Sequence, residues 1–204
     1  PQGALRESTK AAVMARLSAL TADPPPESSA DDRADALSIL ADALGSAGDA
    51  KGARAANERR LAILERAARE APEPAIAATY DYARAGAYVA LGRGDEAVSM
   101  LEERERQMPD AYEPPARRAD VLVQLGRHRE AKDAVERAIA RAYGPRLLRY
   151  KATRADILGK LGDAKGEIEA LRDVIAGYEA LPKGHASAER LDAAKTRLRQ
   201  LESR

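Results

Sequence analysis

The chain of 204 residues contains no cysteine, tryptophan or phenylalanine, and seven tyrosines supply all of its aromatic side chains. Without cysteine the protein forms neither a disulfide nor a thiolate metal site, and thiol catalysis is excluded. No apolar run approaches the ~18 residues of a membrane span, and the N-terminus shows no signal-peptide pattern. These absences leave cytoplasmic and bacterial extracytoplasmic locations equally open. Because the chain begins at Pro1 and not at methionine, we expect it to be a processed or excised piece.

Catalytic and metal-binding motifs are missing as well. The two histidines, His128 and His185, have no spacing to each other or to carboxylates that is typical of metal ligands. No serine stands in a G-x-S-x-G elbow, and no glycine-rich loop follows a strand pattern in the way that a phosphate-binding loop does. We therefore expect a non-catalytic protein that uses no cofactor and no metal.

Charged residues make up 33% of the chain, and the two signs are unevenly distributed. Residues 1–111 carry 14 Lys and Arg against 19 Asp and Glu, whereas residues 112–204 carry 20 against 14. Such a split steers encounters with charged partners, although charged helices also have solvated faces with no further role. The segment 129–154 is basic, with Tyr143 and Tyr150 near its end. This patch is a weak signal for nucleic-acid binding, which we do not expect.

What the sequence does contain is an internal repeat that ends in a glycine. The glycines are 44, 34 and 36 residues apart, and the first and the last of them begin the pentapeptide GDAKG. Four segments align on the repeat: LADALGSAG (40–48), RAGAYVALG (84–92), RADVLVQLG (118–126) and RADILGKLG (154–162).

Each segment has the pattern of an amphipathic helix that ends at its glycine, where a left-handed conformation carries no Cβ penalty. Three positions, three residues apart, form an apolar stripe. We expect Leu125, at the third position, to be buried, so that Leu125→Ala lowers the free energy of unfolding by ~2–5 kcal/mol. The stripe consists of Ala41, Ala85, Ala119 and Ala155, then Leu44, Tyr88, Leu122 and Leu158, then Ala47, Leu91, Leu125 and Leu161.

A second helix is predicted after each glycine, and flanking helices are predicted near both ends. Ala53, Ala97 and Ala131 begin the apolar stripe of the second helices, whereas Glu167 breaks the pattern in the last copy. We expect the longer first spacing to lengthen the first copy's second helix. The second helices are predicted at 49–71, 94–108, 128–142 and 163–180. The chain then divides into 1–30 (N-terminal helix and Pro-rich turn), 31–182 (repeat array) and 183–204 (C-terminal capping helix).

A helix–turn–helix of about 34 residues with these small, large and glycine positions resembles the tetratricopeptide repeat (TPR). The resemblance covers about 34–182, although the family's large aromatic residue near the start of the first helix is missing. It implies an all-α, right-handed α-solenoid of about four TPR-like helical hairpins with N- and C-terminal flanking helices. The last third is also similar to helical tails of bacterial thioredoxin-like fusion proteins, and the Ala- and Arg-rich composition suggests a bacterial source.

The TPR resemblance implies that the first helices line a concave groove that binds a peptide. The family's carboxylate clamp uses Lys and Asn at positions that hold Asp42, Gly86, Asp120 and Asp156 here, so we do not expect a clamp. Three aspartates in register instead suggest a basic or polar ligand. By alignment, the groove candidates are Asp42, Tyr82, Val89, Arg117, Asp120, Gln124, Arg149, Asp156 and Lys160, with Asp35, Ser38, Thr79, Gly86, Glu113, Val123 and Thr153 beside them.

Two of these assignments have alternatives. In the alternative interpretation the aspartates do not bind a ligand but form ion pairs within their own helices, Asp120 with Arg117 and Asp156 with Lys160. Tyr82 and Tyr112 either anchor a ligand, as aromatic residues do at binding hot spots, or fill gaps between helices.

The sequence therefore predicts a protein–protein interaction module that binds a protein or peptide segment and neither nucleic acid nor membrane. One alternative is a structural spacer or self-association element, in which the acidic half of one copy meets the basic half of another. Another is an accessory TPR domain of a larger protein. The sequence names neither the partner nor the oligomeric state.

Overall fold

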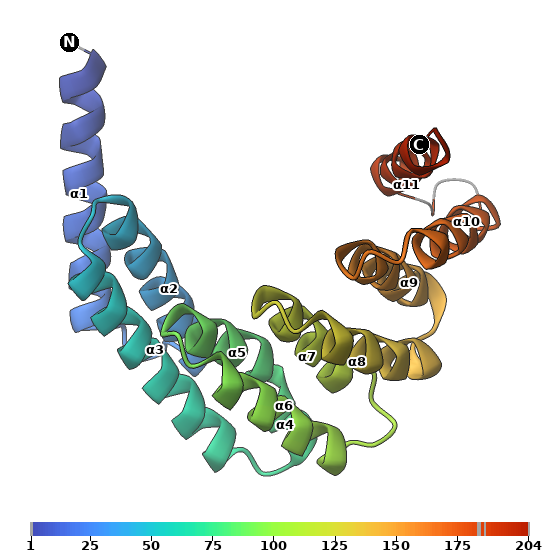
Figure 1. Ribbon diagram of the computed structural model, residues 1–204. Helices are drawn as coiled ribbons and strands as arrows, with labels where there is room; N and C mark the ends of the chain where they lie inside the picture. The colour runs from blue at the N-terminus through green and yellow to red at the C-terminus, as the bar shows by residue number, and fades with distance from the viewer. Residues whose placement is uncertain (1, 183–184, 186, 204) are drawn as a thin grey trace. The chain divides into compact units, whose positions relative to one another are not determined.

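The computed structural model describes residues 2–182, 185 and 187–203, and these residues form eleven α-helices and no strand (Figure 1). The four predicted second helices agree with α3, α6, α8 and α10 to within one residue at each end. The predicted C-terminal segment lies partly on residues 183, 184, 186 and 204, outside the described residues. The helices are α1 (Gln2–Ala22), α2 (Ala30–Ser46), α3 (Ala50–Glu70), α4 (Pro74–Thr79), α5 (Asp81–Ala90), α6 (Gly94–Gln107), α7 (Glu113–Gln124), α8 (His128–Arg141), α9 (Gly144–Lys160), α10 (Ala164–Glu179) and α11 (Ala188–Glu202).

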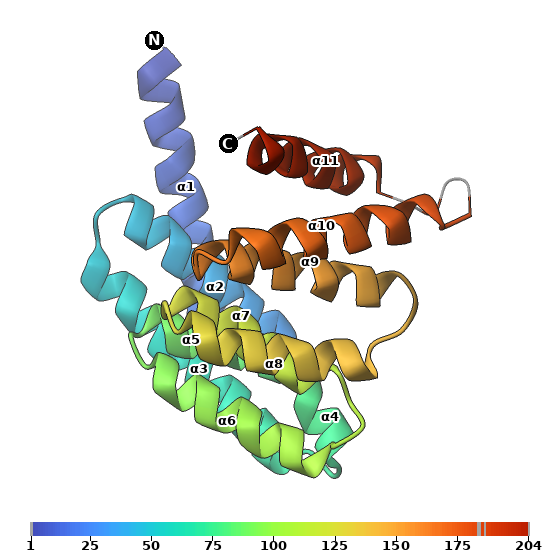
Figure 2. The ribbon, with the colours of Figure 1, turned by 45° about the vertical axis from the view of Figure 1, so that its right-hand side comes forward.

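The chain forms two compact units, Pro1–Ala97 and Val98–Arg204, which divide within α6. In the first unit α2 contacts both α1 and α3, and α3 also contacts α4 and α5. In the second unit each helix from α7 to α11 contacts the next one along the chain, as Figure 1 and Figure 2 show. Each unit is therefore built from neighbouring antiparallel helices with short connections.

The repeated turn ends the first helix of each hairpin as predicted. The glycines that open the turn have φ values of 84° at Gly48, 74° at Gly92, 72° at Gly126 and 76° at Gly162. The N–H of the residue after each glycine donates to a carbonyl oxygen five residues back, as Asp49 does to Leu44 at 2.9 Å. This bond satisfies a carbonyl that the helix end otherwise leaves unpaired.

The pentapeptide GDAKG combines a helix stop with a helix start. Asp49 caps α3 by accepting the N–H of Gly52 at 2.8 Å, and Asp163 caps α10 by accepting the N–H of Gly166 at 2.9 Å. A Cβ at Gly52 would lie 2.3 Å from the capping carboxylate of Asp49. The second glycine of the pentapeptide therefore leaves room for the aspartate cap. This explains why the turn glycine, the aspartate and the second glycine occur together in both copies.

The apolar stripe of the first helices is buried at its first position in every copy, whereas burial at its third position differs between copies, from buried Leu91 to exposed Leu125. The alanines at the first position are all buried, and Leu122 at the second is 0% exposed. Leu125, by contrast, is 38% exposed, so the expectation that it is buried is wrong. Each step of three residues falls about 60° short of a full helical turn, so the third position lies at the edge of the packed face, where burial depends on the neighbouring helix.

The longer first spacing lengthens a second helix, as predicted. Helix α3 has 21 residues, whereas α6 and α8 have 14 each. The remaining extra residues form the short α4, which begins at Pro74 and ends at Thr79, one residue before the N-cap of α5.

The last hairpin departs from the repeat at Glu167. This residue is 4% exposed, and its two carboxylate oxygens accept hydrogen bonds from Nε and Nη2 of Arg197 on α11, at 2.6 and 3.0 Å. Gly159 provides the room, because a Cβ there would lie 2.7 Å from Oε2 of Glu167. The second hairpin has Val89 and Ala97 at these two positions, so the larger side chain has moved from the first helix to the second.

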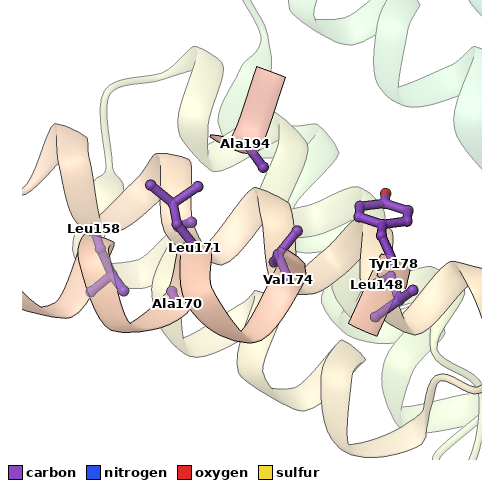
Figure 3. Close-up of a cluster of buried hydrophobic side chains, with 8 residues drawn as sticks. Leu148, Leu158, Ala170, Leu171, Val174, Tyr178 and Ala194 are labelled. Atoms are coloured by element: carbon purple, nitrogen blue, oxygen red, sulfur yellow. The ribbon is translucent and has the colours of Figure 1, made fainter. Parts of the chain in front are cut away.

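Beside this ion pair, apolar side chains join α9, α10 and α11. Ala194 of α11 packs with buried residues of the preceding hairpin, as Figure 3 shows. The terminal helix is thus attached by a charged pair and by apolar contacts. The cluster consists of Leu148, Ala155, Leu158, Ala170, Leu171, Val174, Tyr178 and Ala194.

The positions of Leu122 and Leu125 make a matched test of the helix register. We expect Leu122→Ala to lower the free energy of unfolding by ~2–5 kcal/mol, because it leaves a cavity in the core. Leu125→Ala should have a clearly smaller effect, because its side chain is partly in solvent already. Urea unfolding followed by circular dichroism measures both, and equal losses would contradict the register.

A small residue at position 159 accompanies a large one at position 167, so we expect the effects of substitutions at these two positions on stability to depend on each other. Gly159→Val displaces the Glu167 carboxylate, but Gly159→Val with Glu167→Ala restores the residue pair found in the second and third hairpins. We expect the double variant to be more stable than the two single effects predict, by ~0.5–3 kcal/mol in urea unfolding. Gly159→Val combined with Glu169→Ala, an exposed change on the same helix, is the additive control. If the effects of Gly159→Val and Glu167→Ala simply add, the two side chains do not compete for the same space.

Candidate binding surface

The groove candidates predicted from sequence all lie on α2, α5, α7 and α9, the first helices of the hairpins. Val89 on α5 and Arg117 on α7 are half-buried. The other candidates are exposed to solvent, namely Asp42, Tyr82, Asp120, Gln124, Arg149, Asp156 and Lys160. Three candidates belong to the first unit and six to the second, so each unit presents a surface of its own.

In the first unit Arg60 of α3 lies within electrostatic range of candidates on both α2 and α5. Its guanidinium interacts electrostatically with Asp35 and Asp42 of α2 and with Tyr82 of α5. Burial lowers the pKa of Arg60, and the two carboxylates oppose this shift. Gly86 of α5 lies beside the same group, since a Cβ there would be 3.8 Å from Nη2. Arg60 is thus the centre of a polar cluster between the two helices.

Sequence reasoning missed Arg60, because this residue lies on a second helix and groove positions were sought on first helices alone. No local pattern distinguishes it from Arg59 or Arg54 on the same helix. Its Nε has no hydrogen-bond acceptor among the described residues.

Large apolar side chains accompany this cluster at the surface. Ile39 is 55% exposed and Tyr82 is 72% exposed. Ile39 lies four residues after Asp35 and three before Asp42, so all three side chains share one face of α2. The first unit therefore presents apolar and acidic groups side by side.

In the second unit the candidates form two charged groups on α7 and α9. Asp120 is exposed, yet desolvation by surrounding protein raises the pKa of its carboxyl, and Arg149 of the next hairpin opposes the shift. Desolvation and the Glu167 carboxylate raise the pKa of Asp156, while Lys160 on its own helix and Arg197 oppose it. Lys160 therefore favours the ionised form of Asp156, and direct pairing of the two residues along their helix stays a prediction.

Tyr112 fills space between helices, the second of its two predicted roles. It is 7% exposed, and its ring centroid lies 6.0 Å from that of Tyr143 and 5.8 Å from that of Tyr150. Arg146 lies over the same ring at 5.6 Å and donates to the Tyr112 hydroxyl. Tyr112 thus contacts both other rings, and of these three tyrosines only Tyr143, at 74%, is largely exposed.

The described residues contain neither a metal-binding cluster nor a helix suited to a membrane. No three His, Asp or Glu side chains in this part of the chain form a group that could hold a metal ion. Of the helices built from these residues, none is both long and apolar enough to cross a membrane.

The fold matches solved structures of repeat proteins at low sequence identity. BtubC (BKLC) from P. vanneervenii aligns with a TM-score of 0.61 and 15% identity, covering 96% of this chain and 81% of that one. A putative kinesin light chain from Podosopora anserina with nearly identical TPR-like repeats aligns at 0.57 and 21%, covering 84% and 87%. A thermophilic TPR protein from Thermus thermophilus, TTC0263, aligns at 0.53 and 19%, covering 100% and 99%.

These likenesses confirm the predicted all-α fold of TPR-like hairpins. No protein-family model matches the sequence, and no curated protein matches it. The similarity of the last third to tails of thioredoxin-like proteins is not shown by any of the three structures and stays an expectation.

The pKa of Asp120 predicts how stability responds to its replacement. A carboxyl whose pKa is higher in the folded than in the unfolded state costs stability at neutral pH, and this cost disappears as the pH falls through the raised value. We expect Asp120→Asn to unfold at a higher temperature than the parent at pH 7. The difference should shrink as the pH falls towards the ~3.9 of an unperturbed aspartate. Thermal unfolding at several pH values tests this, and a lower melting temperature for the variant at pH 7 would contradict it.

Proposed function

We propose that the protein is a non-catalytic interaction module that binds a peptide or protein segment on the first helices of its hairpins. The observation that carries this proposal is the exposure of Tyr82 and Ile39, at 72% and 55%, next to the charged cluster around Arg60. Exposed aromatic and aliphatic side chains beside polar groups are typical of protein-binding surfaces.

The architecture supports binding with little reorganisation. Helices α2 and α5 both contact α3, so their faces are held in place before a partner arrives (Figure 1). A preformed surface loses little conformational entropy when it binds. The TPR-like fold supports the same proposal, because the resemblance implies peptide binding by first helices.

The remaining candidates extend the proposed surface within each unit. Val89 adjoins it in the first unit, and a second surface is proposed for Arg117, Asp120, Gln124, Arg149, Asp156 and Lys160 in the second. The uneven charge of the chain favours one other function, self-association of acidic and basic parts of two copies, which salt should weaken strongly.

The proposal is tested by affinity capture from the native cell extract, with bound proteins identified by mass spectrometry. The parent chain is compared with Tyr82→Ala, and Tyr143→Ala is the control because it removes an equally exposed tyrosine from the second unit. We expect a partner that is retained by the control and lost from Tyr82→Ala. Equal recovery with all three proteins, or recovery with none, would count against binding at this surface.

A further inference from the structure

We propose that the surface formed by Asp35, Ile39, Asp42 and Tyr82 around Arg60, here named the α2–α5 face, binds a basic segment of another protein. Lysine or arginine side chains of the segment pair with Asp35 and Asp42, and an aliphatic side chain between them packs on Ile39 and Tyr82. The inference rests on the proposed function and assigns the chemistry of the partner.

The charge of α2 favours a cationic partner. This helix carries four aspartates and one basic residue, Arg33, over its 17 residues. Partial desolvation and the like charges of Asp35 and Asp32 raise the pKa of Asp31, so the carboxylates in this part of the helix repel one another. A cation placed among them relieves this repulsion.

Arg60 offsets the acidic charge only in part. A single guanidinium acts on both Asp35 and Asp42, which leaves the cluster negative. An anionic ligand would approach two carboxylates in order to reach one half-buried arginine. A basic ligand meets the carboxylates directly, since both aspartates are exposed.

The spacing of the aspartates sets a spacing for the partner. Asp35 and Asp42 are seven residues apart, which is about 10 Å along an α-helix. An extended chain covers the same distance in three residues, at ~3.3 Å per residue. The face therefore fits an extended segment with basic residues at positions 1 and 4 and an aliphatic residue between them, opposite Ile39.

The test uses a fluorescein-labelled twelve-residue peptide in which two lysines three residues apart flank a leucine. Its binding to the full chain is followed by fluorescence anisotropy. Two companion peptides replace both lysines with glutamate, or the leucine with serine. We expect the lysine–leucine peptide to bind best, and Asp35→Asn with Asp42→Asn to weaken its binding by about tenfold or more. Tyr82→Ala should weaken it as well.

A matched control removes the same number of charges elsewhere. Glu58→Gln with Glu70→Gln changes two exposed glutamates of α3, each of which pairs with an arginine four residues before it. This variant has the same net charge as the aspartate variant, so we expect it to bind the peptide nearly as the parent does. An equal loss in both variants would show a non-specific charge effect and overturn the inference.

The remaining outcomes separate this inference from the proposed function. If the glutamate peptide binds as well as the lysine peptide and Tyr82→Ala abolishes both, the partner's assigned charge is wrong while the proposed function stands. The same holds if no peptide binds but affinity capture finds a Tyr82-dependent partner. If sedimentation shows self-association that the aspartate variant abolishes, the occupant is a second copy and the assignment to another protein is overturned.

Discussion

The reversal of the chain between the two helices of a hairpin is the constraint on which the rest of the structure depends. A left-handed residue must stand at the end of the first helix, and glycine adopts this conformation without steric cost. At Gly48 and Gly162 the next residue is an aspartate that both completes the stop and caps the following helix. The turn therefore fixes where one helix ends and where the next begins. Once these two points are fixed, the buried alanines of the first helices come to face their neighbours.

Local features such as these explain why the sequence predicted the helices so well. A turn glycine acts on residues close to itself in the chain, so the starts of α3, α6, α8 and α10 could be derived from the spacing of the glycines. Burial at the edge of a helical face depends instead on rotation relative to a neighbour. The same three-residue spacing therefore predicted burial correctly for Leu122 and wrongly for Leu125.

Contacts between distant segments account for what the sequence did not predict. The division of the chain at Ala97 falls inside a regular helix, where neither glycine nor proline interrupts the pattern. Arg60 gains its place between α2 and α5 only because α3 packs against both. The alignment selected Asp42 and Tyr82, which are exposed, because a repeated framework fixes which positions of a first helix point away from its partner.

The break in the repeat at Glu167 has a physical meaning that the sequence alone did not supply. An array of identical hairpins leaves an apolar face on its last member, and that face needs a cover. Here α11 provides it through Ala194 and through Arg197, which pairs with the buried Glu167. A buried carboxylate is costly without its partner, so this pair favours the packing of α11 against α10.

The fold and the proposed binding surface use different residues of the same helices. In α2, Leu37 and Ala41 are buried against neighbouring helices, whereas Asp35, Ile39 and Asp42 lie on the opposite face of the helix and remain exposed. The packing requires the first set and places no demand on the second. The exposed set is therefore free to vary between proteins that share this fold, which is why a structural likeness at 15–21% identity gives the architecture and leaves the ligand to be argued from this chain's own residues.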